Sequence, residues 1–557
     1  MSQIKIDDLT VRYPFQNADI LTNINVDIEK GENILILGPS GGGKSTLAFT
    51  LNGLIPNSFD VETSGRVLID KQPVTDIGLR EMSQQIGILF QDPETQFCME
   101  TVEEEVLFGL ENLQYSKKDM EKRMLDSLTF VGLQNWRSSR IHELSGGMKQ
   151  KLGIACILAM DPDVLILDEP TANLDPASTT EMFALFERIS RQFNKTIILI
   201  EHKLDQVLST IDRVLVLNRH GKLMADATPR AVFENDYDQL TKEGVWVPQL
   251  VQYAKQLEKK GIKWPAMPLT FTEWQQAWQA LGLPEPTEEE RHLTEEEEGV
   301  SREPILQINN VSFSYKNRTV LEEVKLSVQK GDFLAIVGPN GAGKSTLSQM
   351  LIGLLQPEHG EIVIDGVSYE KLRSEALMRQ IGFVFQNPEH QFIADSVEEE
   401  LAYGFKVQGW KEADWKPYVN ELLDTFQLTE QAAQNPFSLS QGQKRRLSVA
   451  TMLTNDQEIL ILDEPTFGQD QENTEALMAL LKDWHARGKT IIMITHDMDL
   501  VYQYADHVAL LQSGKVAYHG HPSIFFQRSH LLKKASIQRP LSYELQPWVH
   551  AVQKVGV

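Results

Sequence analysis

The sequence predicts an α/β protein in which a doubly wound, mainly parallel sheet domain with a phosphate-binding loop occurs twice. Residues 38–46, GPSGGGKST, and residues 338–346, GPNGAGKST, both fit the pattern G-x-x-x-x-G-K-S/T. Short, uninterrupted apolar runs such as NILILG, VLILDEP and TIILIEH are typical of strands buried on both faces of a parallel sheet. Helical periods follow such runs, as in KSTLAFTLNGL directly after the first loop.

Composition narrows the possible functions. The formal net charge of the 557-residue chain is −25, which disfavours non-specific binding to nucleic acid. Two cysteines, Cys98 and Cys156, exclude a disulfide framework and any cysteine-based zinc or iron–sulfur site. No apolar run approaches the roughly 18 residues that span a bilayer, so any role at a membrane is expected to run through partners.

The two loops belong to a duplication of the whole unit. The offset between matching residues falls slowly, from 302 at Tyr13 and Tyr315 to 300 at Lys44 and Lys344, as small loop deletions would produce. The other matching segments are ILFQDPETQF with FVFQNPEHQF, ELSGGMKQKL with SLSQGQKRRL, VLILDEPTANLD with ILILDEPTFGQD, and IILIEHKLD with IIMITHDMD.

The duplication predicts two domains, residues 1–262 and 304–557, joined by a connector of residues 263–303. The connector segment TEWQQAWQALGL predicts a short helix capped by Thr272. Residues 284–303 hold nine Glu against two Arg, so they are expected to form a solvated tether. Within the domains, residues 91–145 and 386–440 predict an inserted helical subdomain in each copy.

The phosphate loops carry the first predicted chemistry. Glycines let backbone N–H groups curl around phosphates, and the helix N-terminus adds positive potential. A plain glycine-rich turn is disfavoured because each loop follows a strand and opens a helix. The predicted ATP-binding residues of the loops are Gly38, Ser40, Gly41, Gly43, Lys44, Ser45 and Thr46, with Gly338, Asn340, Gly341, Gly343, Lys344, Ser345 and Thr346.

Acids and amides at strand ends predict hydrolysis. Asp168 and Glu169 follow four apolar residues, and Asp463 and Glu464 repeat the arrangement. The first acid of each pair suits Mg²⁺, directly or through water, and the second suits polarisation of the attacking water. A surface acid pair would not explain why both copies place the acids after four apolar residues. Gln91 and Gln386 end another strand, where an amide can touch both metal and water, and Ser45 and Ser345 complete the predicted Mg²⁺ ligands.

Two further pairs of positions have weaker signals. His202 and His496 each follow a TII-type strand, and their registration with the other motifs favours contact with the γ-phosphate over a structural role. Tyr13 and Tyr315 suit stacking on adenine, although an aromatic residue near a first strand is often part of the core.

The phosphate loop, the LSGG-type signature, the DEP acids and the trailing histidine resemble the ATP-binding-cassette (ABC) ATPases across nearly the whole chain outside the connector. The resemblance implies an antiparallel β part in each domain and head-to-tail pairing of the two cassettes. Each ATP would lie between one phosphate loop and the other signature. By that resemblance, site one joins Lys44, Gln91, Glu169 and His202 to Ser440, Gln441 and Gly442, and site two joins Lys344, Gln386, Glu464 and His496 to Ser145, Gly146 and Gly147.

The resemblance also implies that Asp175 and Asp470 couple the two sites. Two departures bear on activity. Gln441 stands where glycine is usual and crowds the phosphate, and Met148 stands where glutamine is usual. Both Glu169 and Glu464 are present, so we expect both sites to hydrolyse ATP at unequal rates.

The segments QDPETQF and QNPEHQF, each followed by a V-E-E-E run, are similar to those of energy-coupling-factor (ECF) importers. This resemblance implies a transmembrane coupling subunit gripped by residues 92–97 and 387–392, a separate membrane substrate-binding subunit, and a place on the cytoplasmic face of a prokaryotic membrane. The cargo would be a vitamin, a vitamin precursor such as hydroxymethylpyrimidine (HMP), or a transition-metal ion. The alternative for these segments is an ordinary capped helix start.

Two other classes of tandem-cassette protein are alternatives. A tandem cassette acting on ribosomes would carry a basic-leaning linker, whereas this connector is acidic. A tandem-cassette sugar importer would be expected to lack P-E-x-Q-F. The stretches 245–257 and 540–552 read as amphipathic, and they suit either a role in holding the cassettes together or ordinary packing.

Overall fold

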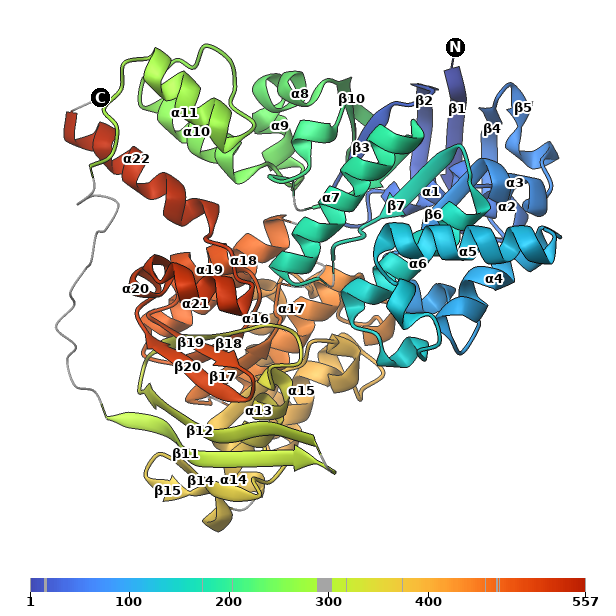
Figure 1. Cartoon of the computed structure of the whole chain (residues 1–557). Helices are drawn as coiled ribbons and strands as arrows, with labels where there is room; N and C mark the ends of the chain where they lie inside the picture. The colour runs from blue at the N-terminus through green and yellow to red at the C-terminus, as the bar shows by residue number, and fades with distance from the viewer. Residues whose placement is uncertain are drawn as a thin grey trace. The chain divides into compact units, whose positions relative to one another are not determined.

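The computed structural model describes residues 2–14, 18–172, 174–202, 204–287, 303–316, 318–372, 374–455, 457–466, 469 and 471–555. It divides into two compact units, Met1–Leu283 and Pro284–Val557. Each unit contains a six-stranded sheet and a four-stranded sheet with matching strand orders (Figure 1). The duplicated α/β fold predicted from the sequence is therefore confirmed.

The six-stranded sheets form the cores. All neighbouring strands are parallel except the last hairpin, β9 with β10 and β19 with β20. Every residue of β7, β8, β17 and β18 is buried, which explains their uninterrupted apolar sequences. In spatial order the strands are β10 Leu223–Ala227, β9 Arg213–Leu217, β3 Asn33–Leu37, β8 Thr196–Ile200, β7 Val164–Asp168 and β6 Ile86–Leu89, and then β16 Ile381–Val384, β17 Ile459–Asp463, β18 Thr490–Ile494, β13 Phe333–Val337, β19 His507–Gln512 and β20 Lys515–Gly520.

The four-stranded sheets are antiparallel, as the family resemblance implied. Figure 1 shows β1, β2 and β4 side by side in the first unit. Apolar residues alternate along β2, so one face of this sheet packs on the core. The strands are β2 Leu21–Glu29, β1 Ser2–Arg12, β4 Glu62–Ile69 and β5 Gln72–Pro73, and β12 Arg318–Gln329, β11 Pro304–Tyr315, β14 His359–Ile364 and β15 Val367–Ser368.

Helices complete both units, and the predicted helical insertions are α4 with α5 and α15 with α16. Among the described residues, no helix has the length and apolarity needed to cross a bilayer. The helices of the first unit are α1 Lys44–Leu51, α2 Leu54–Asn57, α3 Leu79–Gln85, α4 Val102–Asn112, α5 Lys117–Val131, α6 Gly146–Met160, α7 Pro176–Phe193, α8 Pro229–Asn235, α9 Tyr237–Lys242, α10 Gln249–Lys259 and α11 Phe271–Ala280. Those of the second unit are α13 Lys344–Leu351, α14 Ser374–Gln380, α15 Val397–Val407, α16 Glu412–Thr425, α17 Gln441–Thr451, α18 Gln471–Ala486, α19 Met498–Tyr504, α20 Pro522–Gln527, α21 Ser529–Ala535 and α22 Leu541–Val555.

Helix α11 begins two residues earlier than the sequence analysis expected. The predicted N-cap at Thr272 is wrong, because Thr270 caps the helix by accepting a hydrogen bond from the Glu273 amide at 3.2 Å. Glu273 also accepts the Leu269 amide at 2.8 Å, which fixes this start. Trp274 and Trp278 of α11 are fully buried and lie within the first compact unit. Most of the acidic part of the connector, residues 288–302, lies outside the described residues.

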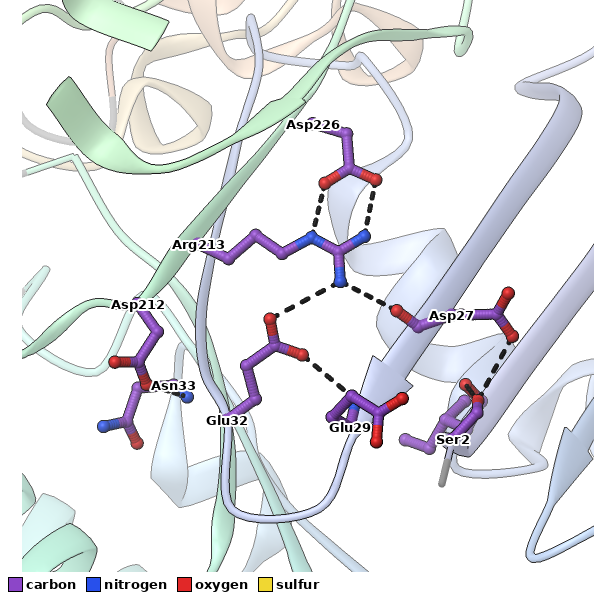
Figure 2. A network of polar contacts seen from close by, with 9 residues as sticks. Ser2, Asp27, Glu29, Glu32, Asn33, Asp212, Arg213 and Asp226 are labelled. Atoms are coloured by element: carbon purple, nitrogen blue, oxygen red, sulfur yellow. Dashed lines mark hydrogen bonds and ion pairs between the residues drawn. The ribbon is translucent and has the colours of Figure 1, made fainter. Parts of the chain in front are cut away.

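An ion-pair network joins the two sheets of the first unit (Figure 2). Arg213, at the start of β9, binds Asp226 of β10 through two nitrogens, one of them Nη2 at 2.6 Å from Asp226 Oδ2. Its Nη1 donates to the main-chain oxygen of Asp27 at 2.8 Å and lies 3.4 Å from Glu32 Oε1. The network thus ties the last hairpin of the core sheet to β2 and to the turn before β3.

Candidate nucleotide-binding and hydrolysis sites

Each phosphate loop lies between the end of a central strand and the start of a helix. Gly43 precedes α1 with φ at +88°, and a Cβ there would lie 2.7 Å from the Ile20 main-chain oxygen, so the turn requires glycine. Lys44 Nζ donates to the main-chain oxygens of Gly38 at 2.9 Å and Pro39 at 3.0 Å. The ammonium group is thereby held inside the loop, where it can meet a phosphate.

The second loop has the same arrangement. Lys344 Nζ donates to Gly338 O at 2.7 Å and Pro339 O at 3.1 Å, and Gly343 precedes α13 with φ at +101°. Both loops therefore present a lysine ammonium and a helix N-terminus, which together favour an anionic ligand.

The two predicted hydrolytic glutamates share an unusual backbone conformation. Glu169 follows the last residue of β7 with φ at +46°, and Glu464 follows β17 with φ at +47°. Their amides donate to the main-chain oxygens of Ile200 and Ile494, each at 2.9 Å. A positive φ is strained for a non-glycine residue, and such strain concentrates at functional sites. The turn directs both side chains to the carboxyl-terminal edge of the sheet.

Glu169 brings three predicted residues together. Gln91 Nε2 donates to Glu169 Oε2 at 2.7 Å, and His202 Nε2 lies 2.8 Å from Glu169 Oε1. Burial raises the pKa of Glu169, but the hydrogen bond and charge of His202 and the charge of Lys44 outweigh it, so the pKa lies below its ordinary value. The carboxyl group is therefore charged at neutral pH and able to accept a hydrogen bond from water.

In the second cassette the contacts around the predicted hydrolytic glutamate, Glu464, differ from those around Glu169. His496 contacts Glu464 through Nδ1, 2.8 Å from Glu464 Oε2. Arg445 of α17 donates to the main-chain oxygens of Phe385 at 2.5 Å and Gln386 at 2.6 Å. Arg445 is 2% exposed, and burial lowers its pKa to about 10.

This role of Arg445 was not predicted from the sequence. In the first copy the matching residue is Gln150, whose Nε2 donates to the Gln91 main-chain oxygen at 3.2 Å. The signal available in the sequence was a change from glutamine to arginine at the fifth position after the signature serine. In both copies the signature helix therefore holds the main chain of the strand-end glutamine.

The predicted Mg²⁺ ligands fit a hard cation. Burial raises the pKa of Asp168 and of Asp463 to about 6. Asp168 Oδ1 is buried, and among the described residues no donor meets it. The Ser45 hydroxyl is hydrogen-bonded to the same carboxylate, and a carboxylate with a neighbouring hydroxyl supplies the oxygen donors that Mg²⁺ prefers. The residues present therefore fit the ion.

The two tyrosines predicted to stack on adenine have different surroundings. Tyr13 is half-buried, and its hydroxyl lies 3.4 Å from Thr46 Oγ1 of the phosphate-loop helix. Tyr315 is 47% exposed and packs edge-on against Phe313 at 4.9 Å between ring centroids. Exposure suits the predicted stacking on adenine at Tyr315, and the loop contact suits it at Tyr13. Both roles stay predictions.

Of the two predicted coupling acids, Asp175 lies among the described residues. Asp175 caps α7, where its Oδ1 accepts the Ser178 amide at 2.8 Å and its Oδ2 accepts the Ser178 hydroxyl at 3.2 Å. A Cβ on Gly147 of the signature would lie 3.1 Å from Ser178 Oγ, so Asp175 and the signature helix share a neighbour. Asp470 lies outside the described residues.

Each signature serine caps the helix that follows it. Ser145 Oγ accepts the Met148 amide at 3.4 Å. Ser440 Oγ accepts the Gln443 amide at 3.3 Å, and Gln443 Oε1 accepts the Ser440 amide at 2.9 Å, which completes a capping box. The thioether of Met148 lacks the amide oxygen for this second bond, so the first signature has the looser start. Gly146, Gly147, Gln441 and Gly442 form the first turns of these helices.

The P-E-x-Q-F segments are joined to the signature helices. Glu94 forms an ion pair with Lys149 of α6, and Glu389 Oε1 lies 2.6 Å from Lys444 Nζ of α17. Both lysine side chains are largely buried, at 14% and 9% exposure. Each pair joins residues 55 positions apart, which no local pattern predicts.

The third glutamate of each V-E-E-E run has a structural role. Glu105 Oε2 accepts the amides of Cys98 and Met99 at 2.9 and 2.8 Å. Glu400 Oε2 accepts those of Ile393 and Ala394 at 2.8 and 2.7 Å. Both glutamates are buried, and each fixes the chain directly after its P-E-x-Q-F segment.

Comparison with known proteins shows the family. The family model described as ABC transporter matches residues 21–172 and 321–467. The protein YkoD of Bacillus subtilis (strain 168), provisionally named as an HMP/thiamine import ATP-binding protein, is 39% identical over 97% of this chain and 96% of its own. A protein of Methanosarcina acetivorans, provisionally named as an ABC transporter ATP-binding protein, is 35% identical over 98% of this chain and 90% of its own.

One similar solved structure is cbiO1 of Clostridium perfringens, described as part of the ABC transporter complex cbiONQ. It is 31% identical, covers 44% of this chain and 99% of its own, and aligns with a TM-score of 0.39. The family match and the two relatives show that the chain belongs to the ABC transporter family. It is an ATPase of that family with two ATP-binding cassettes in one polypeptide.

Proposed function

We propose that the chain is the ATP-hydrolysing, energy-coupling subunit of an ECF-type importer. One observation carries this proposal: in both cassettes the glutamate of the P-E-x-Q-F segment is paired with a largely buried lysine of the signature helix. A surface that grips a membrane partner and a helix that meets phosphate would then move as one body. The provisional name of YkoD supports an importer of a vitamin precursor. The cargo is a vitamin, a vitamin precursor or a transition-metal ion, selected by a separate membrane subunit.

In the proposed reaction each residue has one task. Lys44 and Lys344 bind the β- and γ-phosphates inside their loops. Glu169 and Glu464 orient the attacking water and accept its proton, and the charged state of Glu169 suits it to this task. His202 and His496 hold the γ-phosphate.

Mg²⁺ would be held by Ser45, Gln91 and Asp168 in one cassette and by Ser345, Gln386 and Asp463 in the other. When bound, the ion supplies positive charge that neutralises the phosphate oxygens.

The two cassettes comprise residues 1–262 and 304–557. Each complete ATP site contains residues of both cassettes. The serine and glycines of one signature close the phosphate loop of the other cassette, with Ser440 serving the Glu169 site and Ser145 the Glu464 site. The capped helix starts at both serines present free N–H groups, which favour an anion. Asp175 and Asp470 couple the two sites.

Exposed apolar side chains near the P-E-x-Q-F segments support a partner surface. In the second cassette Ile393 is 63% exposed, directly after QNPEHQF, and Tyr403 of α15 is 49% exposed. Met99 and Phe108 are exposed in the first cassette. Such side chains mark surfaces that bind other proteins. The partner is the transmembrane coupling subunit, at the cytoplasmic face of a prokaryotic membrane.

Affinity purification of the tagged full-length chain from detergent-solubilised membranes of its source cells tests the proposal. We expect two integral membrane proteins to be retained with the parent chain. One of them should be absent when the Glu389→Lys variant is purified, because this substitution breaks the ion pair with Lys444. A Glu370→Lys variant, which changes a charge away from this segment, is the control. Recovery of the chain with ribosomes, or of no membrane protein with any variant, would contradict the proposal.

A further inference from the structure

In the first cassette, the chain that follows the core returns to the loop bearing His202. The ring of Trp246 lies 6.5 Å from that of His202, with 56° between the ring planes. The neighbours of Trp246, Val245 and Val247, are 1% and 3% exposed, so the backbone that carries the indole is fixed. Three residues after His202, Asp205 Oδ2 accepts the amide of Gln249, the first residue of α10, at 3.5 Å.

The other sides of His202 are already held. Its Nε2 contacts Glu169, and its amide donates to Glu201 Oε1 at 2.9 Å. Glu201 is buried and accepts the Thr171 hydroxyl at 2.7 Å. The backbone and one ring nitrogen of His202 are thus fixed, and the tilted indole of Trp246 is an aromatic neighbour of the same ring.

The second cassette has a contact at the matching place, between the segment after His496 and the helix after the core, formed by different residues. Asp499, three residues after His496, accepts both the amide and the hydroxyl of Ser542, at 3.0 and 2.6 Å. Ser542 lies in α22 and is 1% exposed. Tyr502 and Tyr543 pack edge-on at 5.4 Å beside this pair. In both cassettes, therefore, the helix after the core is attached to the segment that follows the histidine.

We infer that the segment after each cassette holds the histidine loop of that cassette, and that Trp246 is the positioning residue for the His202 ring. The inference rests on the proposed role of His202 at the γ-phosphate. An aromatic wall restricts the rotamers of the imidazole, and aromatic pairs at this distance attract each other. A small displacement of a group that aligns the reacting phosphate lowers turnover more than it lowers nucleotide binding, because the phosphate loop supplies the binding.

The test uses the full-length chain carrying Glu464→Gln, so that turnover comes from the first cassette. In this background Trp246→Leu should lower kcat about tenfold and leave the KM for ATP within about twofold. Trp246→Phe, which keeps an aromatic ring at a wider gap, should lower kcat about two- to threefold. Trp136→Leu, which removes an exposed tryptophan of the helical subdomain, is the control and should match the parent.

Two measurements distinguish three cases: Trp246 positions the His202 ring, Trp246 only stabilises the fold, or His202 has no role in hydrolysis. If Trp246 acts through His202, then Trp246→Leu should have no further effect in a His202→Ala chain. A His202→Ala chain with parental turnover would refute the proposed role of His202 itself.

If His202→Ala is inactive and Trp246→Leu keeps the parental kcat, the inference about Trp246 is overturned. If Trp246→Leu has a lower melting temperature than the parent, the Trp246→Phe variant is measured instead. A kcat equal to the parent's in Trp246→Phe would also overturn the inference.

Discussion

His202 Nε2 lies 2.8 Å from Glu169 Oε1, whereas the matching pair in the second cassette meets through the other ring nitrogen, Nδ1 of His496 with Glu464 Oε2. Glu169 also receives the Gln91 amide at 2.7 Å. The strand-end glutamine of the second cassette has its main chain bound by the Arg445 guanidinium. The two glutamates therefore act in different surroundings, and we expect the two sites to differ in rate.

Single glutamate substitutions test this asymmetry. Glu169→Gln and Glu464→Gln each remove one water-orienting carboxylate and should slow hydrolysis at their own site at least about 100-fold. Phosphate release by the full-length chain should then fall by unequal amounts in the two variants, with measurable turnover left in each. Complete loss in only one variant would contradict the expectation that both sites hydrolyse ATP.

The signature helices offer a test of stability. Met148→Gln should complete in α6 the capping box that Ser440 and Gln443 form in α17. We expect it to raise the free energy of unfolding by about 0.5–1 kcal/mol, and Gln443→Met to lower it by a similar amount. Urea unfolding of both variants measures this. A lower unfolding midpoint for Met148→Gln would show that residue 148 has another role.

The last hairpin of the second core sheet should give that cassette a pH-dependent stability. His507 and His519 occupy the places of Arg213 and Asp226, since His507 pairs with Leu334 as Arg213 pairs with Ile34. The two histidine rings lie 5.8 Å apart, and His507 Nδ1 lies 3.4 Å from Asp332 Oδ2. Burial, and then the charge of His507, lower the pKa of His519 below its ordinary value.

A histidine with a lowered pKa contributes its stability above its unfolded value, about 6.5, and loses it as pH falls through the folded value. The free energy of unfolding should therefore decrease between pH 7.5 and 5.5, by at most about 1.4 kcal/mol per pH unit for one proton, and the urea midpoint should decrease with it. The nearby Asp506, whose pKa is lowered overall by the hydrogen bond from His485 despite its burial, stays charged in this window.

The control exchanges the two networks. His507→Arg with His519→Asp should recreate the pair formed by Arg213 and Asp226 and reduce the pH dependence. Arg213→His with Asp226→His should introduce a pH dependence in the first cassette. An equal pH dependence in the parent and the His507→Arg, His519→Asp chain would show that other groups titrate.

Much of the fold and the site follows from local sequence. Lys44 and Glu169 could be found because a loop or a strand end fixes where each side chain points, and the duplication confirmed each pattern. The pairs Glu94–Lys149 and Arg445–Gln386 could not, because they join segments far apart in sequence whose distance only the packed sheet and helices set. The error at Thr272 has a local cause: Thr270 and Glu273 form a capping pattern two residues earlier, and the glutamate outweighed Gln275.

We propose that each ATP is hydrolysed between a phosphate loop of one cassette and the signature of the other. Aspartate caps a helix as well as serine does, yet its charge repels phosphate, so Ser440→Asp and Ser145→Asp are matched probes. In the Glu464→Gln chain, where Glu169 alone is active, phosphate release is measured with each substitution. We predict that Ser440→Asp abolishes the remaining turnover and that Ser145→Asp leaves most of it. The reverse outcome, loss with Ser145→Asp alone, would show that each cassette completes its own site.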